Sequence, residues 1–266
     1  MRLSGHSILA TLTPFGFPNR VDLQFQEGFL EDMPYEVPHY LADYAMRNTH
    51  VPVGFWRCVN HTQNCFFKEC FIDELAHAAG ADPYEYRHRL LAGHPRAGKF
   101  RDVLDAAAKT AAWGTPTPAG VFRGIAVEEA NGTYVAAVAE ASVSDQGNVR
   151  MHRIVVAINP GHVVNPLTVD MQTQSAIVYG LTAALYGEIT IKDGRVEQSN
   201  FNDYQMLRIA DMPKVETIIM PSGDFWGGVG EPPVSIVAPA LCNAVFAATG
   251  KRIRSLPLKN HDLRRA

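Results

Sequence analysis

The chain has 266 residues, of which 47% are hydrophobic, 24 are lysine or arginine and 27 are aspartate or glutamate, for a net charge of −3. This length can bury a sizeable core in one large domain or two small ones, and the small negative balance gives no reason to expect nucleic acid. The four cysteines include no Cys-x-x-Cys pair, which argues against a zinc or iron–sulfur site in this chain. No apolar run approaches the roughly 20 residues of a membrane span, so none is expected.

The first part of the chain is expected to be irregular and the next part helical. Prolines interrupt residues 1–55, and a natural N-terminus rarely starts in this way, so we expect a piece of a longer polypeptide. A helix that ends near Gly80 follows, and four apolar residues at helical period form its predicted buried face: Phe67, Phe71, Leu75 and Ala78. Two more helices are expected, at 82–91, which opens with an Asp-Pro start signal, and at about 100–113.

After a linker at 114–120 the pattern changes to the alternation typical of strands. Tight turns at Asn131-Gly132 and at 145–148 predict hairpins that join three strands, at 121–130, 133–144 and 149–158. The elements expected next are a small-residue helix, a hairpin, a strand and an apolar helix, at 167–186, 192–195, 214–220 and 233–249. Strand runs mixed with helices, without a regular βαβ alternation, indicate an α+β fold with mixed or antiparallel sheets and packed helices. We expect one domain over 1–266, with a candidate division into subdomains 1–115 and 116–266.

The stretch with the most chemical content is Gly227-Gly228-Val229-Gly230-Glu231-Pro232-Pro233, which leads into the last predicted helix. Glycines let the backbone approach a ligand closely, and a helix start offers free N–H groups to an anion. A glutamate in a first helical turn is usually a favourable partner of the helix dipole. Beside apolar walls, however, a carboxylate can take up a proton as a general base. The residues alone leave both interpretations of Glu231 open.

Two other segments contain candidate site residues. The loop Gly54-Phe55-Trp56-Arg57 precedes the first helix, and an arginine with aromatic neighbours can bind a planar or anionic group, although a structural loop with a buried tryptophan explains the same residues. A strand that ends at Asn159-Pro160 leads into the small-residue helix that contains Gln172. We assign a structural role to three acidic residues of the first helix, on its solvent or capping face: Glu69, Asp73 and Glu74.

Taken together, these segments resemble the C-terminal end of the molybdopterin-binding (beta) subunit of the xanthine dehydrogenase and aldehyde oxidase family. Within it, the chain most resembles the isoquinoline 1-oxidoreductase beta subunits and related bacterial aldehyde dehydrogenases. The resemblance runs from about residue 7 to 263, and its two specific elements are the Gly-Phe-Trp-Arg and Gly-Val-Gly-Glu-Pro-Pro segments. It implies the C-terminal part of a molybdenum cofactor-binding domain.

The resemblance also implies roles for particular residues. Glu231 would be the catalytic base beside the molybdenum, and Trp56 and Arg57 would flank the metal pocket. Gln172 falls on the position of a glutamine that hydrogen-bonds the pterin. The glycine-rich segment 227–231, called the bend below, would add cofactor contacts through its backbone N–H groups, at Gly228, Val229 and Gly230. The chain departs from the family where relatives have glycine, with Cys58 and Asn60, and where they have an acidic-glycine pair, with Gln174 and Ser175.

The activity implied is that of a molybdenum hydroxylase, which oxidises an N-heterocycle or an aldehyde with oxygen from water. It would use a molybdenum–molybdopterin cytosine dinucleotide cofactor and pass electrons to iron–sulfur clusters on a small partner subunit. The N-terminal remainder of the molybdenum subunit would complete the site, so the isolated chain is expected to be inactive. In bacteria, the resemblance favours a periplasmic over a cytoplasmic location.

Two other classes of function remain open. One is a non-catalytic scaffold or partner-binding fragment of such a complex. The other is a cofactor-independent enzyme, such as a hydrolase that uses Glu231, although the sequence has no nucleophile–base motif.

Overall fold

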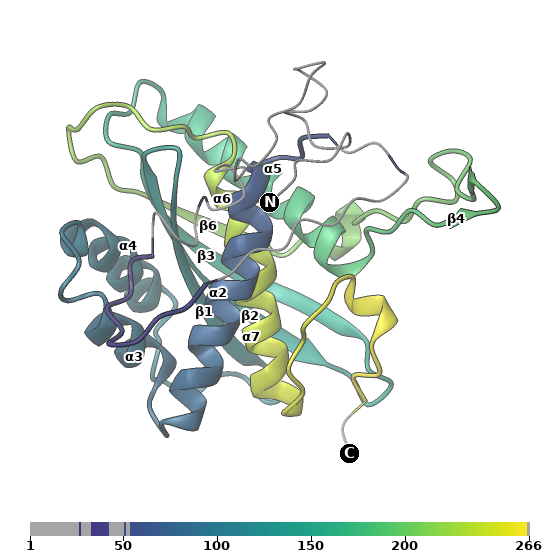
Figure 1. Cartoon of the computed structure of the whole chain (residues 1–266), viewed down its shortest axis with the longest axis horizontal. Helices are drawn as coiled ribbons and strands as arrows, with labels where there is room; N and C mark the ends of the chain where they lie inside the picture. The colour runs from purple at the N-terminus through teal and green to yellow at the C-terminus, as the bar shows by residue number, and fades with distance from the viewer. Residues whose placement is uncertain (1–26, 28–32, 43–50, 52–53, 265–266) are drawn as a thin grey trace.

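Three consecutive antiparallel strands form the centre of the fold: β1 (Phe122–Ala130), β2 (Thr133–Val143) and β3 (Val149–Asn159). A fourth strand, β6 (Lys214–Ile219), runs parallel to β3, so the sheet has the order β1-β2-β3-β6. The computed structural model describes residues 27, 33–42, 51 and 54–264, and Figure 1 shows the sheet at its centre. The predicted α+β fold with a mixed sheet is confirmed. Most of the segment expected to be irregular lies outside the described residues.

The tight turn between β1 and β2 has the geometry that its sequence predicts. Asn131 has a φ of 52° and Gly132 a φ of 76°. Two successive residues in the left-handed region are typical of a type I′ turn, whose twist suits paired strands. The small hairpin of β4 (Ile191–Lys192) and β5 (Arg195–Val196) has nearly the same angles, 51° and 75°, at its two central residues.

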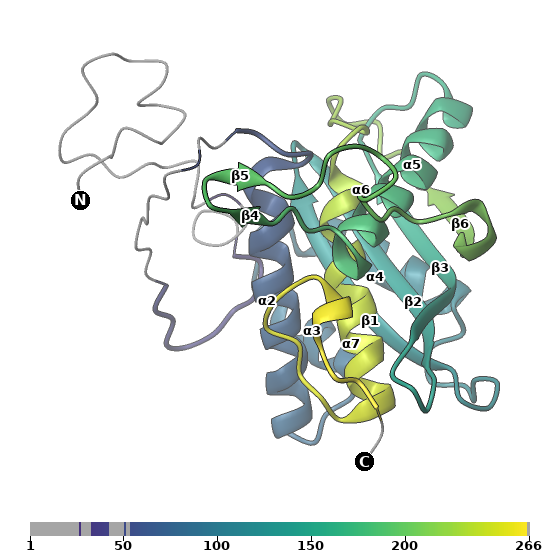
Figure 2. The same ribbon diagram turned by 90° about the vertical axis from the view of Figure 1, so that its right-hand side faces the viewer.

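Helices cover both faces of the sheet (Figures 1 and 2). On one face, α7 (Val237–Thr249) and α5 (Pro166–Leu185) form an apolar cluster with alternate strand residues. On the other face, α4 (Ala97–Thr110) forms a second cluster with the remaining alternate residues. The longest N-terminal helix, α2 (Val59–Ala78), lies against α7 and contacts β1. The shorter elements are α3 (Pro83–Leu90), α6 (Pro232–Ser235) and the 3-10 turns at Ile209–Asp211 and Leu258–Asn260.

The apolar face predicted for α2 is wrong. Phe67 and Phe71 are about half exposed, at 52% and 53%. The charged side chains of Lys68 and Glu69 are buried instead. Spacing identifies a helix, but it does not decide which face is inward when the inner face contains paired charges.

Two buried ion pairs hold α2 in place. Lys68 Nζ lies 2.6 Å from a carboxylate oxygen of Glu128 on β1, and Arg87 Nε of α3 lies 2.9 Å from a carboxylate oxygen of Glu69. Burial by itself lowers the pKa of Lys68, but Glu128 and the further neighbours Cys65 and Glu69 together outweigh it, so the net shift is upward. Buried charges of this kind are tolerated because each has an opposite partner.

The sequence predicts the acidic residues of α2 on a solvent or capping face, but two of the three lie inside the protein. Glu69 and Asp73 are buried, at 0% and 4% exposure. Asp73 forms an ion pair with Arg252, whose terminal nitrogen lies 2.7 Å from a carboxylate oxygen of Asp73. A basic residue distant in sequence therefore compensates the charge of Asp73. Glu74 is partly exposed and pairs with Arg254, also at 2.7 Å. The expected structural role of these carboxylates fits their pairing, but the expected exposure was wrong for two of them.

The last helical segment is a core element of this fold. The stretch Pro232–Thr249 is long and apolar enough to cross a membrane by composition, yet 83% of it is buried here. It lies so close to β1 that a Cβ at Gly124 would be 2.2 Å from the carbonyl oxygen of Ala240. Glycine at this strand position therefore allows the helix and sheet backbones to pack closely.

We expect Gly124→Ala to destabilise the chain by about 1–3 kcal/mol, because the added methyl group forces α7 away from β1. Gly98→Ala in α4 is the matched control, since a Cβ there meets no atom within 4 Å. That change should be neutral or stabilising by up to about 1 kcal/mol. Urea unfolding of both variants measures the difference, and equal stabilities would contradict the close packing.

Candidate functional site

Glu231 lies where the bend, α2 and the β1–β2 turn meet. The backbone N–H of Cys58 donates to its Oε1 at 3.0 Å, and the side-chain amide of Asn131 donates to its Oε2 at 3.2 Å. Glu231 as a whole residue is exposed to solvent. Residues separated by 173 and 100 positions in the chain thus fix both oxygens of one carboxylate while leaving it accessible.

Arg57 fastens the bend to α5. Its Nε donates to the carbonyl oxygen of Gly230 at 2.7 Å, and a terminal nitrogen donates to the same oxygen. The guanidinium also donates to the side-chain oxygen of Gln172 at 3.2 Å and to the hydroxyl of Ser175 at 3.1 Å. Burial lowers the pKa of Arg57, and the nearby Tyr179 and Glu231 oppose that shift. Because its donors are used within the protein, Arg57 holds the site together instead of offering a free cation to a ligand.

Trp56 lies at the surface beside the same cluster. It is 40% exposed, and its ring centroid is 4.7 Å from that of Tyr179 on α5. The alternative of a buried tryptophan in a structural loop is therefore wrong. The structure brings Trp56, Arg57, Gln172 and Glu231 to one side of the fold, while the functional roles of these residues remain predictions.

The α2 start that supplies the Cys58 N–H has unusual backbone geometry. Cys58 has a φ of 66° and Val59 a φ of 40°, both in the region that favours glycine. The Cys58 side chain is fully buried against Ala130 and Val234, and burial strongly raises the pKa of its thiol. This thiol therefore stays protonated, and the contribution of Cys58 to the site is its backbone N–H.

The glycines of the bend have different roles. Gly227 packs against the β1–β2 turn, since a Cβ there would lie 2.2 Å from Thr133 Oγ1. Internal packing therefore explains why glycine occupies this position. The N–H of Gly228 donates to the carbonyl oxygen of Asn131 at 2.9 Å and is likewise used within the fold. Among the described residues, no acceptor faces the N–H groups of Val229 and Gly230. These two amides are the donors of the bend that remain for a ligand.

The sequence analysis missed several residues around this cluster. The sequence pattern indicates only a turn for Asn131 and a place in the small-residue helix for Tyr179, not their contacts with Glu231 and Trp56. A row of near-parallel rings also precedes the bend: Trp226 lies 6.2 Å from Phe225 and 5.8 Å from His162 between ring centroids. Phe225 is 91% exposed and Trp226 64%. Two adjacent aromatics before a glycine run were the signal that could have indicated this surface.

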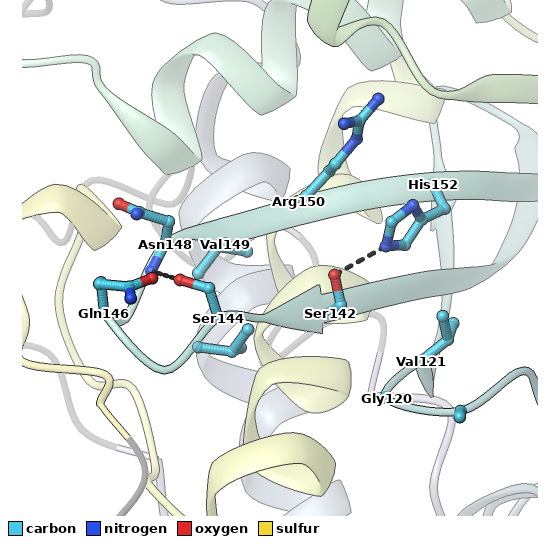
Figure 3. Close-up of a pocket in the computed structure, with 11 residues that line it drawn as sticks. Gly120, Val121, Ser142, Ser144, Gln146, Asn148, Val149, Arg150 and His152 are labelled. Atoms are coloured by element: carbon cyan, nitrogen blue, oxygen red, sulfur yellow. Dashed lines mark hydrogen bonds between the residues drawn. The ribbon is translucent and has the colours of Figure 1, made fainter.

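A separate pocket of about 550 Å³ lies at the other end of the β2–β3 hairpin (Figure 3). Its lining includes the Ser142 hydroxyl and the His152 imidazole, which are 2.7 Å apart and hydrogen-bonded. None of the residues predicted for the site lines it. Ser142 lies near the end of β2 distant from Asn131, so this pocket and the Glu231 cluster are different places on the molecule.

Comparison with known proteins decides the family. A family model described as a molybdopterin cofactor-binding domain matches residues 84–213. The chain is 33% identical over 229 residues to a membrane-bound aldehyde dehydrogenase (pyrroloquinoline-quinone) of Gluconacetobacter polyoxogenes. It is 28% identical over 229 residues to isoquinoline 1-oxidoreductase subunit beta of Brevundimonas diminuta. The chain belongs to the molybdopterin-binding subunits of the xanthine dehydrogenase and aldehyde oxidase family.

The matches cover 80% and 85% of this chain but only 30% and 29% of those two relatives. Among solved structures, the aldehyde oxidoreductase of Desulfovibrio desulfuricans has a similar fold, with a TM-score of 0.66, 14% identity and coverage of 77% of this chain and 40% of that chain. The family model does not extend over Arg57 or Glu231. The roles of Arg57 and Glu231 must therefore be argued from the geometry of this chain.

The residues around Glu231 have a donor set that fits a pterin cofactor. Pterins present ring nitrogens and carbonyl oxygens, which need N–H donors. Three such donors face no acceptor among the described residues: the amides of Val229 and Gly230 and the side-chain amide nitrogen of Gln172. Arg57 donates a hydrogen bond to the side-chain oxygen of Gln172, which leaves the amide nitrogen of Gln172 free to donate to a ligand.

Proposed function

We propose that this chain forms part of a molybdenum hydroxylase subunit in which Glu231 is the general base. The complete enzyme would oxidise an N-heterocycle or an aldehyde with oxygen from water. Its cofactor would be a molybdenum–molybdopterin cytosine dinucleotide, and its electrons would pass to iron–sulfur clusters on a small partner subunit. The N-terminal remainder of the molybdenum subunit would complete the substrate site. We also propose a periplasmic location.

The observation that carries this proposal is the state of the Glu231 carboxylate. Two donors from separate elements fix its oxygens, at 3.0 and 3.2 Å, yet the residue is exposed. A carboxylate with only a structural role is normally paired with a cation or covered, as Glu69 and Glu128 are in this chain. An oriented, accessible carboxylate beside free N–H donors is what base catalysis at a bound cofactor requires.

The residues of this chain would divide the work between binding and proton transfer. The amides of Val229 and Gly230 and the Gln172 side chain would hold and orient the cofactor, which supplies the two-electron oxidation when bound. Glu231 would accept the proton of the water whose oxygen enters the product. Arg57 would hold the bend against α5 by its hydrogen bonds to the Gly230 carbonyl and to Gln172.

Cofactor analysis of the complete subunit, co-expressed with its partner, tests this proposal. We expect about one molybdenum per subunit, a pterin, and cytosine nucleotide released by acid hydrolysis, whereas the isolated chain should contain no molybdenum and oxidise no substrate. Since one relative is named a pyrroloquinoline-quinone aldehyde dehydrogenase, the same extract should be assayed for that quinone. A complete protein with quinone and no molybdenum would refute the proposed cofactor. A complete protein with neither would favour the scaffold alternative.

A further inference from the structure

Asn131 contacts the Glu231 segment twice. Its side-chain amide donates to Glu231 Oε2 at 3.2 Å, and its backbone carbonyl accepts the N–H of Gly228 at 2.9 Å. The segment 228–231 is thus attached to the β1–β2 turn at both of its ends. The turn itself belongs to the central sheet, where every residue of β1 pairs with β2 up to the turn.

The backbone of Asn131 explains why its side chain can reach the carboxylate. Its φ of 52° lies in the left-handed region, which asparagine tolerates better than most residues. Asn-Gly is a favourable hairpin sequence in any case, so the turn needs no contact with Glu231 to form. The hydrogen bond to Glu231 is therefore an additional property of this turn, made possible by the amide group.

The two donors to Glu231 have different freedom to move. The Cys58 N–H belongs to the backbone at the start of α2, while the Asn131 amide is a side chain on the sheet. With the Cys58 contact alone, the carboxylate could rotate about that single hydrogen bond. A second donor on the other oxygen fixes the plane of the carboxylate, which determines where its free lone pairs point.

We infer that Asn131 is a positioning residue for the base, one that orients the Glu231 carboxylate through its side-chain amide. This inference depends on the proposed role of Glu231. It predicts that loss of the amide lowers kcat of the complete enzyme by about 10-fold with KM changed by less than about twofold, since catalysis depends on the orientation of the base. Asn131→Asp should lower kcat further, by about 100-fold, because a second carboxylate repels the charged form of Glu231 and favours the protonated form, which cannot act as the base.

Asn131→Gly is the informative variant, because glycine also tolerates the left-handed φ and Gly-Gly is compatible with a type I′ turn. Asp193→Gly is its matched control. Asp193 has a φ of 51°, is followed by a glycine in the same kind of turn, and has no hydrogen bond to the site. Both variants remove a side chain from the same turn position, so a difference between them in kcat reports the Asn131 amide and not the turn.

A spectroscopic measurement on the chain itself separates this inference from the proposed function. In the 15N-labelled chain, the Asn131 side-chain amide signals should move towards those of a solvated amide when Glu231 is replaced by alanine, while those of Asn165 at the start of α5 stay unchanged. If the signals do not move, the positioning inference is wrong whatever Glu231 does. If they move and Glu231→Gln keeps full turnover, the base assignment is wrong although the contact exists. If they move, Glu231 proves essential and Asn131→Gly keeps normal kcat, positioning by Asn131 is again refuted.

Discussion

Replacing Glu231 with glutamine in the complete, molybdenum-loaded enzyme is expected to lower kcat by about 10²–10⁴-fold, the usual cost of losing a general base. Glutamine has the size of glutamate, so its side-chain oxygen can still accept the Cys58 N–H. Asn131 can turn its own amide so that its oxygen faces the new NH2 group. The substitution therefore removes the basic group and preserves the shape of the site.

Molybdenum and pterin content measured on the same sample makes the result interpretable, because the residues assigned to cofactor binding are unchanged. Glu197→Gln is a suitable control, since Glu197 is an exposed carboxylate next to the small β4–β5 hairpin. We expect normal turnover from the control. Turnover within a few-fold of wild type in a metal-replete Glu231→Gln enzyme would show that another group takes the proton.

Much of the fold could be predicted from the sequence because local chemistry determines it. Asn131-Gly132 specifies a turn with two positive φ angles, and the structure has them at 52° and 76°. The Asp82-Pro83 signal likewise marks the start of α3, where the Asp82 side chain accepts the N–H of Tyr84 and Glu85. In both cases the determining interactions lie within a few residues, so the sequence contains them.

The inward face of α2 and the second role of Asn131 could not be predicted in this way. Lys68 and Glu69 are buried because Glu128 and Arg87 approach from β1 and α3, and only the tertiary fold brings these charges together. The contact between Asn131 and Glu231 spans 100 residues. The sequence identified Glu231 through its glycine-rich neighbours and the family resemblance, whereas the residues that orient it come from other elements.

The buried pair of Arg87 and Glu69 leads to the largest stability effect we expect. Arg87 and Glu69 are both fully buried, and Glu69 also accepts hydrogen bonds from the Tyr35 hydroxyl at 2.7 Å and the Val127 N–H at 3.1 Å. Arg87→Met keeps much of the side-chain volume but leaves the Glu69 charge buried without its cation. Removing one partner of a buried ion pair typically costs about 3–5 kcal/mol, so the variant should lose about that much free energy of unfolding.

A double variant shows whether the uncompensated charge is the cause. In Arg87→Met with Glu69→Gln, the glutamine is neutral and its oxygen can still accept from Tyr35 or Val127, so most of the lost stability should return. The exposed pair of Arg254 with Glu74 is the matched comparison, since Arg254 is 66% exposed and Arg254→Met should cost less than about 1 kcal/mol. Urea unfolding of the four chains gives the values. If the double variant is as unstable as Arg87→Met, lost packing around the arginine, and not the buried charge, determines the stability of this part of α2.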